Sequence, residues 1–197
     1  MSALRNLMAR LRRREDGAMI VELVIMLPLL LWCFAGSWVF FDAYRTKAVN
    51  ERAAYMIGDA LSRETGYVTP VYLTSFKALQ DLLVDGRPTR LRVSVFSYDA
   101  ARDSYTVRWS LPVASSLSGI DLAVLNDFKL EQMRDQLPVM PDGEVATMVE
   151  SWIDYTPLFD VGLDPFTFEE VAVTRPRFAG QLCFNDSLAG LPLDALC

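Results

Sequence analysis

The sequence contains no histidine and only three cysteines among its 197 residues. The lack of histidine excludes His-based catalytic triads, a histidine general base and every metal site that needs an imidazole ligand. The motifs G-x-S-x-G, G-x-x-x-x-G-K-[ST] and S-x-x-K are also absent, so neither a nucleophilic serine nor a phosphate-binding loop is indicated. We therefore expect a protein that is not an enzyme and that needs no cofactor.

Positive charge is scarce outside the N-terminus. The chain has 19 Lys and Arg against 25 Asp and Glu, a net charge of −6. Residues 1–17 contain five arginines and carry a net charge of +3, which leaves −9 for the remainder. Because neutralising phosphates requires clustered Lys and Arg, we expect no nucleic-acid partner. A basic start followed by an acidic remainder instead favours a membrane.

The acidic residues form no recognisable metal-binding pattern. Neither D-x-[DN]-x-[DN]-G nor C-x-x-C occurs in the chain, so neither an EF-hand loop nor a zinc site is indicated. The densest acidic group comprises Asp160, Asp164, Glu169 and Glu170. We interpret it as a solvated face rather than a calcium site and expect no metal.

One long apolar run, residues 18–41, stands out in the N-terminal part, and Glu22 is its only charged residue. As a helix, 24 residues reach about 36 Å, which exceeds the roughly 30 Å hydrocarbon core of a bilayer. The run is also longer than the apolar region of a secretory signal. We predict a transmembrane helix, with the arginines before it in the cytoplasm and residues 42–197 outside.

The cysteines agree with an external C-terminal domain. Cys183 and Cys197 enclose a short loop, and outside the cytoplasm such a pair is free to oxidise. We predict a disulfide between them. Cys33 lies inside the apolar run, where we interpret it as a small packing residue.

The remaining sequence predicts an α+β fold, with a long N-terminal helix packed against a small antiparallel sheet. Residues 42–66 contain no proline, so the helix should continue past the membrane to a total of about 46 residues. An apolar stripe at helical spacing should be covered by the domain; it comprises Tyr44, Ala48, Ala54, Tyr55, Ile57 and Leu61. The other expected elements are a helix at 71–84, a β-hairpin at 90–109, a short helix near 127–136, strands at 144–155 and 168–174, and a surface loop at 156–167.

The junction between the basic leader and the apolar run carries the most specific pattern. It reads R-R-R-E-D-G17 followed by A18-M-I-V-E22, with Pro28 further along the run. A basic leader, a glycine directly before the apolar segment and a carboxylate five residues into it resemble the processing site of type IV prepilins and pseudopilins. In that family cleavage falls after the glycine, which corresponds here to the bond between Gly17 and Ala18, and the helix stays in the protein. Glu22 matches the glutamate of that family.

Within this class the chain is similar to the TadE/TadF-like minor pseudopilins of the Tad (Flp) pilus system. The similarity includes G-A-x-x-V-E at 17–22, L-P-L-L-L at 27–31, Y-T-P at 155–157, R-P-R at 175–177 and the late cysteine pair. It leaves open whether the role is TadE-like or TadF-like. It implies a pilin-like fold, a bacterial inner-membrane location, and a prepilin peptidase, other minor pseudopilins and the pilus assembly platform as partners.

Two alternatives remain open at the level of sequence. A single-pass envelope protein, acting as a sensor or a secretion-apparatus anchor and retaining residues 1–17, would also carry a glycine before its span and a glutamate that reaches the headgroups. For a processed chain, the carboxylate of Glu22 has two candidate partners, the new α-ammonium of Ala18 in the same chain or that of the next subunit. We expect Arg175 and Arg177 to be solvated or bound to carboxylates of the domain.

Overall fold

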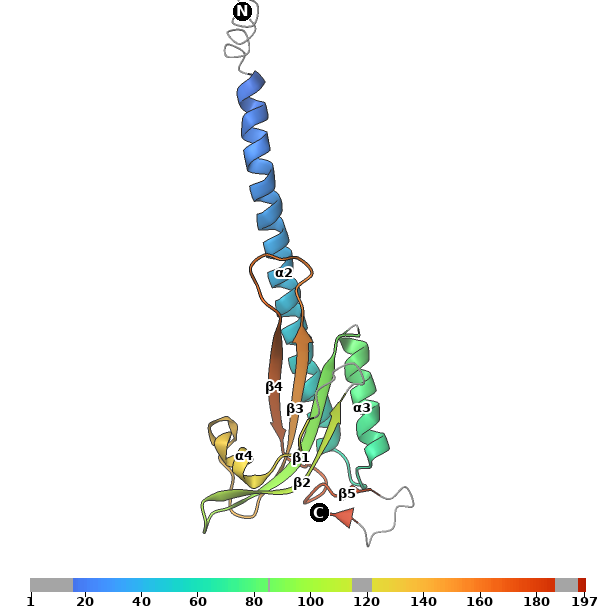
Figure 1. Cartoon of the computed structure of the whole chain (residues 1–197). Coiled ribbons are helices and arrows are strands. Elements are labelled where there is room, and N and C mark those ends of the chain that lie inside the picture. Colours follow the sequence, from blue (N-terminus) through green and yellow to red (C-terminus); the bar gives the residue numbers. More distant parts are fainter. Residues whose placement is uncertain (1–15, 85, 115–121, 187–194) are drawn as a thin grey trace, which may run out of the picture. The chain divides into compact units, whose positions relative to one another are not determined.

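The structure is a computed structural model that describes residues 16–84, 86–114, 122–186 and 195–197, without the side chains of residues 16–18 and 114 (Figure 1). The expectations for the leader before residue 16 lie outside the described residues. The chain divides into two compact units. One contains Met1–Ala43 and Pro157–Asp164, and the other contains Tyr44–Thr156 and Pro165–Cys197.

The first element, α2, is a helix of 47 residues, Asp16–Ser62. Its length agrees with the predicted 46 residues, because the charged and alanine-rich part after the apolar run contains no helix breaker. Pro28 lies inside the helix. Lacking an N–H, it leaves the carbonyl of Val24 without its usual helical hydrogen bond. Helices in lipid tolerate such a proline.

Four strands form an antiparallel sheet with the order β2-β1-β3-β4. Their bounds are Thr89–Asp99 for β1, Ser104–Ala114 for β2, Val145–Tyr155 for β3 and Phe166–Thr174 for β4. Parts of the strands alternate apolar and polar residues, as at Leu91, Val93 and Val95 of β1, which is the pattern that a pleated surface selects. β3 agrees with its predicted range to within one residue, whereas β4 begins two residues earlier than predicted, so the loop between them shortens from 156–167 to residues 156–165.

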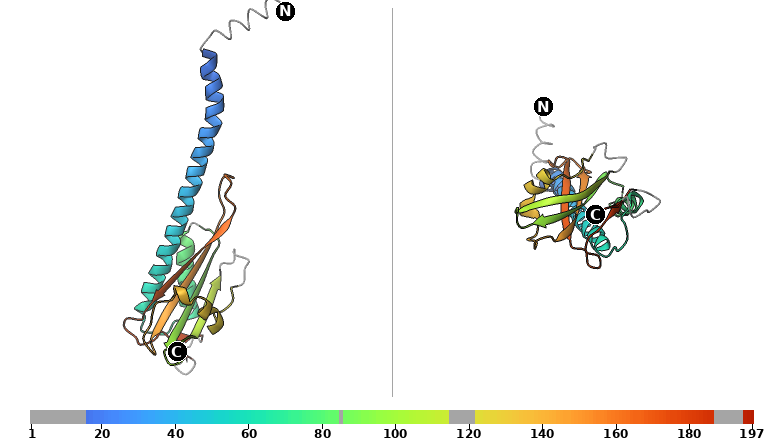
Figure 2. Two further views of the ribbon diagram at one scale, coloured as in Figure 1. Left: turned by 90° about the vertical axis from the view of Figure 1, so that its left-hand side faces the viewer. Right: turned by 90° about the horizontal axis from the view of Figure 1, so that it is seen from below.

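Short elements cover the two faces of the sheet (Figures 1 and 2). Helix α3, Pro70–Leu83, begins with Pro70 and is capped by Thr69, whose side chain accepts a hydrogen bond of 3.3 Å from the Tyr72 amide. The remaining elements are α4 (Asp127–Gln132), a 3₁₀ turn (Arg134–Gln136), β5 (Phe184–Asn185) and β6 (Ala195–Leu196). The predicted short helix near 127–136 therefore consists of α4 and the 3₁₀ turn.

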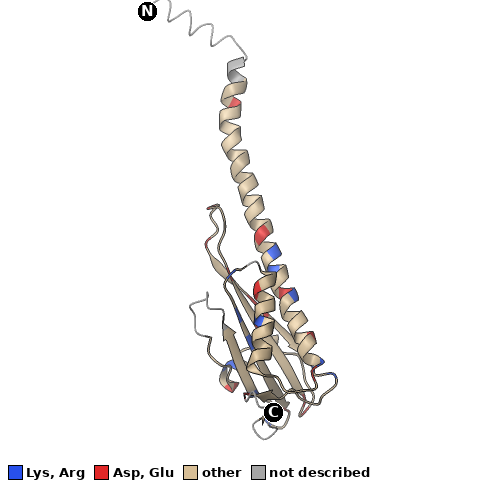
Figure 3. Ribbon diagram, turned by 90° about the vertical axis from the view of Figure 1, so that its right-hand side faces the viewer, with Lys and Arg blue, Asp and Glu red and all other residues tan. Residues whose placement is uncertain are grey.

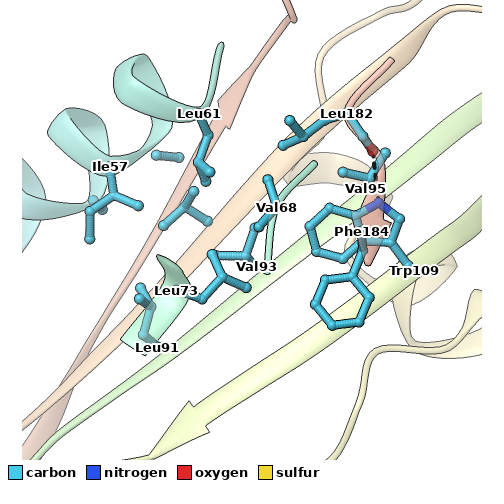
Figure 4. Close-up of a cluster of buried hydrophobic side chains, with 13 residues drawn as sticks. Ile57, Leu61, Val68, Leu73, Leu91, Val93, Val95, Trp109, Leu182 and Phe184 are labelled. Carbon is cyan, nitrogen blue, oxygen red and sulfur yellow. Dashed lines mark hydrogen bonds between the residues drawn. The ribbon is translucent and has the colours of Figure 1, made fainter. Parts of the chain in front are cut away.

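The core divides into two clusters, one on each face of the sheet. On one face, Ile57 and Leu61 of α2 and Leu73 of α3 pack on the strands (Figure 4). On the other face, Phe96 and Leu130 belong to a second cluster that includes α4. The predicted α+β fold, with the long helix packed on a small antiparallel sheet, is confirmed.

The predicted apolar stripe of α2 is only partly correct. Ala54, Ile57 and Leu61 are fully buried, but Tyr44 is 72% exposed and Tyr55 is 52% exposed. Residues two apart on an α-helix point about 200° apart, so Tyr55 cannot share a face with Ile57. The sequence pattern merged two opposite faces of the helix, one buried against the sheet and one outward.

Candidate functional site

The first half of α2 presents apolar side chains on all of its faces. All residues from 19 to 34 are exposed, and no residue of the most apolar 18-residue window, whose mean hydropathy is 2.3, is buried. Figure 3 shows this part of the helix almost free of charge. Each large apolar side chain left in water forgoes about 1.5–3 kcal/mol, a total of tens of kcal/mol here. Within the part of the chain that the structure describes, this is the one helix long and apolar enough to cross a membrane.

Two polar side chains of this half differ in whether they have a hydrogen-bond or ion-pair partner. The hydroxyl of Ser37 donates a hydrogen bond of 2.8 Å to the carbonyl of Cys33, one turn earlier. Glu22 is exposed and forms no ion pair within the described residues. Such a carboxylate in lipid costs about 2.5–3.5 kcal/mol at the bilayer centre and less near the edge. Glu22 is therefore the group in this half that has most to gain from a partner.

The predicted processing site lies in the first turn of α2. The backbone of Gly17 and Ala18 is helical, and the structure does not describe their side-chain surroundings. Four residues separate Ala18 from Glu22, which corresponds to about one turn and about 6 Å along the axis. A new amino group at Ala18 would therefore lie within reach of the Glu22 carboxylate of its own chain.

The outward face of α2 in the second unit carries apolar and charged side chains together. Met56 is 49% exposed beside the exposed Tyr55. A shallow hollow on this face is lined by Ala48, Glu51, Arg52, Tyr55, Met56 and Asp59. Tyrosine and methionine are enriched at protein interfaces, so this face can accept another protein surface.

The cysteines occupy different environments. Cys183 and Cys197 form a disulfide, whereas Cys33 is free and exposed on the apolar half of α2. The backbone around Cys183 is also held by hydrogen bonds, because its carbonyl accepts from the Val68 amide at 2.8 Å. In addition, the Trp109 indole donates to the Leu182 carbonyl at 2.8 Å (Figure 4). The disulfide therefore ties the C-terminal residue to a segment that already belongs to the core.

The arginines of the R-P-R motif bind carboxylates of the domain. Arg175 pairs with Glu144 at 3.1 Å, and Arg177 pairs with Asp59 of α2 at 3.1 Å. Both guanidinium groups remain more than half exposed, and exposed pairs of this kind contribute at most about 1 kcal/mol each. Their assignment to domain carboxylates is confirmed.

The acidic group of the sequence does not form one face. Asp160 and Asp164 lie on the exposed loop after β3, but Glu169 and Glu170 are neighbours within β4 and point to opposite sides of the sheet. Burial and the charge of Glu51 raise the pKa of Glu170, which Lys47 partly offsets. The described residues contain no cluster of three or more potential metal ligands.

Several buried polar pairs were not predicted from the sequence. Arg92 of β1 and Glu150 of β3 form a fully buried ion pair, and Arg92 also donates to the Ala123 carbonyl at 2.9 Å. Alternation along β1 suggests a solvated face at this position. The segment around Ala123 helps to cover the ion pair, and the sequence of this segment has no regular apolar pattern.

A second buried polar group connects α2, α3 and β3. The Ser151 hydroxyl donates to the Asn50 amide oxygen and accepts from the Gln80 amide. The side chains are at most 1% exposed, so these hydrogen bonds replace part of the water contact that is lost on folding, although Oε1 of Gln80 has no hydrogen-bond partner within the described residues. This network fixes the register of both helices on the sheet.

The β1–β2 turn holds a small polar cluster. Asp103, whose φ is 48°, accepts a hydrogen bond of 2.7 Å from the Tyr98 hydroxyl and pairs with Arg134. The Tyr98 hydrogen bond and the Arg134 pair lower the pKa of Asp103, and the same hydrogen bond raises the pKa of Tyr98. They hold the turn in place, since Arg134 also donates to the Asp103 carbonyl at 2.9 Å.

The structure thus separates the predicted residues into two places. Gly17, Ala18 and Glu22 share the first turns of α2, whereas Cys183 and Cys197 lie in the second unit. No protein-family model, curated protein or solved structure matches this chain.

Proposed function

We propose that the protein is a minor pseudopilin of a Tad (Flp) pilus, with a pilin-like fold. The chain is inserted in the bacterial inner membrane through residues 18–41, with residues 1–17 in the cytoplasm and residues 42–197 in the periplasm. A prepilin peptidase removes residues 1–17. The mature chain then joins other minor pseudopilins and the assembly platform in a subcomplex that initiates the pilus or forms its tip.

The observation that carries this proposal is the lone carboxylate of Glu22 one turn after Ala18. Ser37 satisfies its hydroxyl within the helix, and Glu22 has no ion-pair partner among the described residues. In the unprocessed chain the Ala18 nitrogen is a neutral amide. Cleavage after Gly17 converts it to an ammonium, so processing creates the cation that Glu22 needs in lipid.

That cation can belong to the same chain or to the next subunit. An intramolecular pair would stabilise the end of a single helix. A pair between subunits would also fix the axial offset between neighbouring helices, because only one offset aligns the carboxylate with the ammonium. We favour the intersubunit pair, since it makes assembly depend on processing.

The outward face of α2 supports an assembly role. Tyr44, Tyr55 and Met56 are about half exposed or more, although other residues of the same helix segment are buried completely. Such a face suits contact with a neighbouring subunit. The disulfide between Cys183 and Cys197 supports a periplasmic domain, because structural disulfides persist in oxidising compartments.

The test is the intact mass of the protein from the membrane fraction of cells that contain a prepilin peptidase. We expect a chain that begins at Ala18, and we expect Gly17→Leu to retain residues 1–17. Gly36→Leu is a matched control, since a Cβ atom added at Gly36 meets nothing within 4 Å, and it should be processed normally.

A mature protein that keeps residues 1–17 and still supports pili would refute the proposal. It would favour a single-pass sensor or secretion-apparatus anchor. A cut near residues 35 and 36 would instead identify the apolar run as an ordinary secretory signal.

A further inference from the structure

The two hairpin loops of the sheet differ in length and chemistry. The β1–β2 turn, residues 100–103, is short and is held by the Asp99 carboxylate, which accepts from the amides of Ala101 at 2.9 Å and Arg102 at 3.2 Å. The β3–β4 loop, residues 156–165, has ten residues. Hairpins usually need only two to five. The longer loop therefore has more residues than reversal of the chain requires.

The β3–β4 loop exposes apolar side chains. Leu158 is 75% exposed and Phe159 is 45% exposed, and they are adjacent in sequence. The loop contains Asp160 and Asp164 but no lysine or arginine. Leu158 therefore keeps most of its surface uncovered by the described residues, and Phe159 keeps nearly half, so both side chains have surface left for a partner outside the chain.

The division of the chain into two compact units indicates which surface contacts Leu158 and Phe159. Pro157–Asp164 belongs to the same compact unit as the first part of α2, and Figures 1 and 2 both show the loop alongside this helix. On that part of α2, side chains become buried only near its end, where Val39 is 1% exposed and Ala43 is 7% exposed. These two residues are one turn apart and share a face. The loop thus accompanies α2 where the apolar run ends at residue 41.

We propose that the β3–β4 loop lies in the outer interface of the bilayer, with Leu158 and Phe159 inserted at the boundary between headgroups and acyl chains. This proposal rests on α2 spanning the membrane, which it shares with the proposed function. The end of an apolar run marks the membrane–water boundary, and aromatic and aliphatic side chains partition into that zone. The domain is then attached to the membrane at two points.

The charges of the loop indicate the class of lipid. Two carboxylates in a loop that contains no lysine or arginine are repelled by an anionic surface, so the loop suits zwitterionic headgroups. Asp160 accepts a long hydrogen bond of 3.4 Å from the Gly162 amide and remains exposed. In the headgroup layer both carboxylates can stay hydrated or contact the ammonium of a zwitterionic lipid.

Depth-dependent fluorescence quenching tests the proposal in the full chain. A Cys33→Ala background leaves the disulfide intact, and an environment-sensitive fluorophore is attached to Leu158→Cys, Phe40→Cys or Ala101→Cys. All three positions are exposed, so labelling should not disturb the fold. Each protein is placed at low density in phosphatidylcholine vesicles that contain nitroxide-labelled lipid.

We expect strong quenching at Phe40→Cys, quenching at Leu158→Cys that is greatest for nitroxides near the headgroup, and none at Ala101→Cys, which lies at the opposite end of the sheet. Phe159→Asp should reduce the quenching at Leu158→Cys several-fold. Adding phosphatidylglycerol should not increase it.

The outcomes separate this proposal from the proposed function. Quenching at Phe40→Cys without quenching at Leu158→Cys refutes the loop proposal and leaves the membrane span intact. An absence of quenching at both positions refutes the span itself. Blue-shifted but unquenched emission at Leu158→Cys, appearing only at high protein density, would assign the loop to contact with another copy and would also refute the lipid proposal.

Discussion

The two halves of α2 belong to one unbroken helix but are exposed in different ways. Residues 19–34 are apolar and exposed on every face, whereas residues 44–62 bury one face and expose the other. A helix adapted to water needs an apolar stripe of limited width, and a helix adapted to lipid needs apolar residues all round. The exposure pattern therefore distinguishes the half that is long and apolar enough to cross a membrane from the half that packs on the sheet.

Glu22 gives the largest expected effect. Glu22→Ala should abolish co-purification with other pilins and sharply reduce piliation, because it removes the group that we propose to pair with a processed N-terminus. Insertion, cleavage and unfolding of the domain should be unchanged. Affinity purification, pilus counts and the intact mass provide the readouts.

Ser37→Ala is the control for Glu22, since the Ser37 hydroxyl donates to a carbonyl of its own helix, and it should assemble normally. Normal piliation by Glu22→Ala at wild-type expression would rule out the assembly role. Loss of the protein itself would indicate that Glu22 stabilises only the end of its own helix.

Leucines in the two halves should respond differently to truncation. Leu61 is fully buried and Leu30 is 63% exposed. We expect Leu61→Ala to lower the free energy of unfolding of the domain by about 2–5 kcal/mol through a cavity, and Leu30→Ala to leave it unchanged. Urea unfolding of the full chain in detergent, followed by near-ultraviolet circular dichroism, measures both. Equal losses would show that the exposure difference does not report packing.

Two glycines of α2, Gly36 and Gly58, sharpen the comparison. A Cβ at Gly58 would lie 2.9 Å from the Thr174 methyl group, whereas one at Gly36 meets nothing within 4 Å. Gly58→Leu should therefore destabilise the domain by about 1–3 kcal/mol, and Gly36→Leu should not. Thr174→Ser removes the methyl group and should restore part of the loss in the double variant. Equal thermal midpoints for both glycine variants would contradict this close approach.

The smallest effect concerns the β1–β2 turn. The pKa of Asp103 is lowered by the Tyr98 hydrogen bond and by Arg134, and the pKa of Tyr98 is raised. The Asp103 contribution is complete above its ordinary value of 3.8 and is lost as the pH falls below it. The Tyr98 contribution is complete below 10.0 and is lost as the pH rises above it.

Asp103→Asn should flatten both edges of the stability profile, while asparagine tolerates the positive φ at this position. Thermal midpoints measured from pH 2 to 11 provide the readout. Identical profiles for the variant and the wild type would show that these hydrogen bonds add nothing to stability.

Local patterns allowed most of the secondary structure to be predicted. The uninterrupted run after Phe41 indicates a continuous helix, and the alternation around Val93 and Val149 indicates strands. Tyr44 and Tyr55 were misassigned because an aromatic residue suits either a core or an interface. The sequence pattern also left out Asn50, since a lone amide on a helix gives no sign of a partner 101 residues away.

The candidate sites show the same limits. Gly17, Ala18 and Glu22 are close in sequence, so their arrangement follows from helix geometry alone. The Arg92–Glu150 pair joins residues 58 apart, and its burial depends on how the chain crosses the sheet. Leu158 and Phe159 were predicted to lie in a surface loop, which is correct, but composition alone could not indicate which surface covers them.

The contacts between α2 and the sheet determine when, during translation, the helix can pack on its strands. Asn50 reaches its strand partner, Ser151, only after 101 further residues, and the Gly58 carbonyl receives the Thr174 hydroxyl after 116. At translation rates of about 5–20 residues per second, that delay is roughly 5–20 s. During this interval the buried face of the helix has no sheet to cover it, and hydrophobic surface exposed for seconds invites aggregation. In a nascent chain of this design the sheet-facing side of α2 therefore stays uncovered until β3 and β4 have emerged.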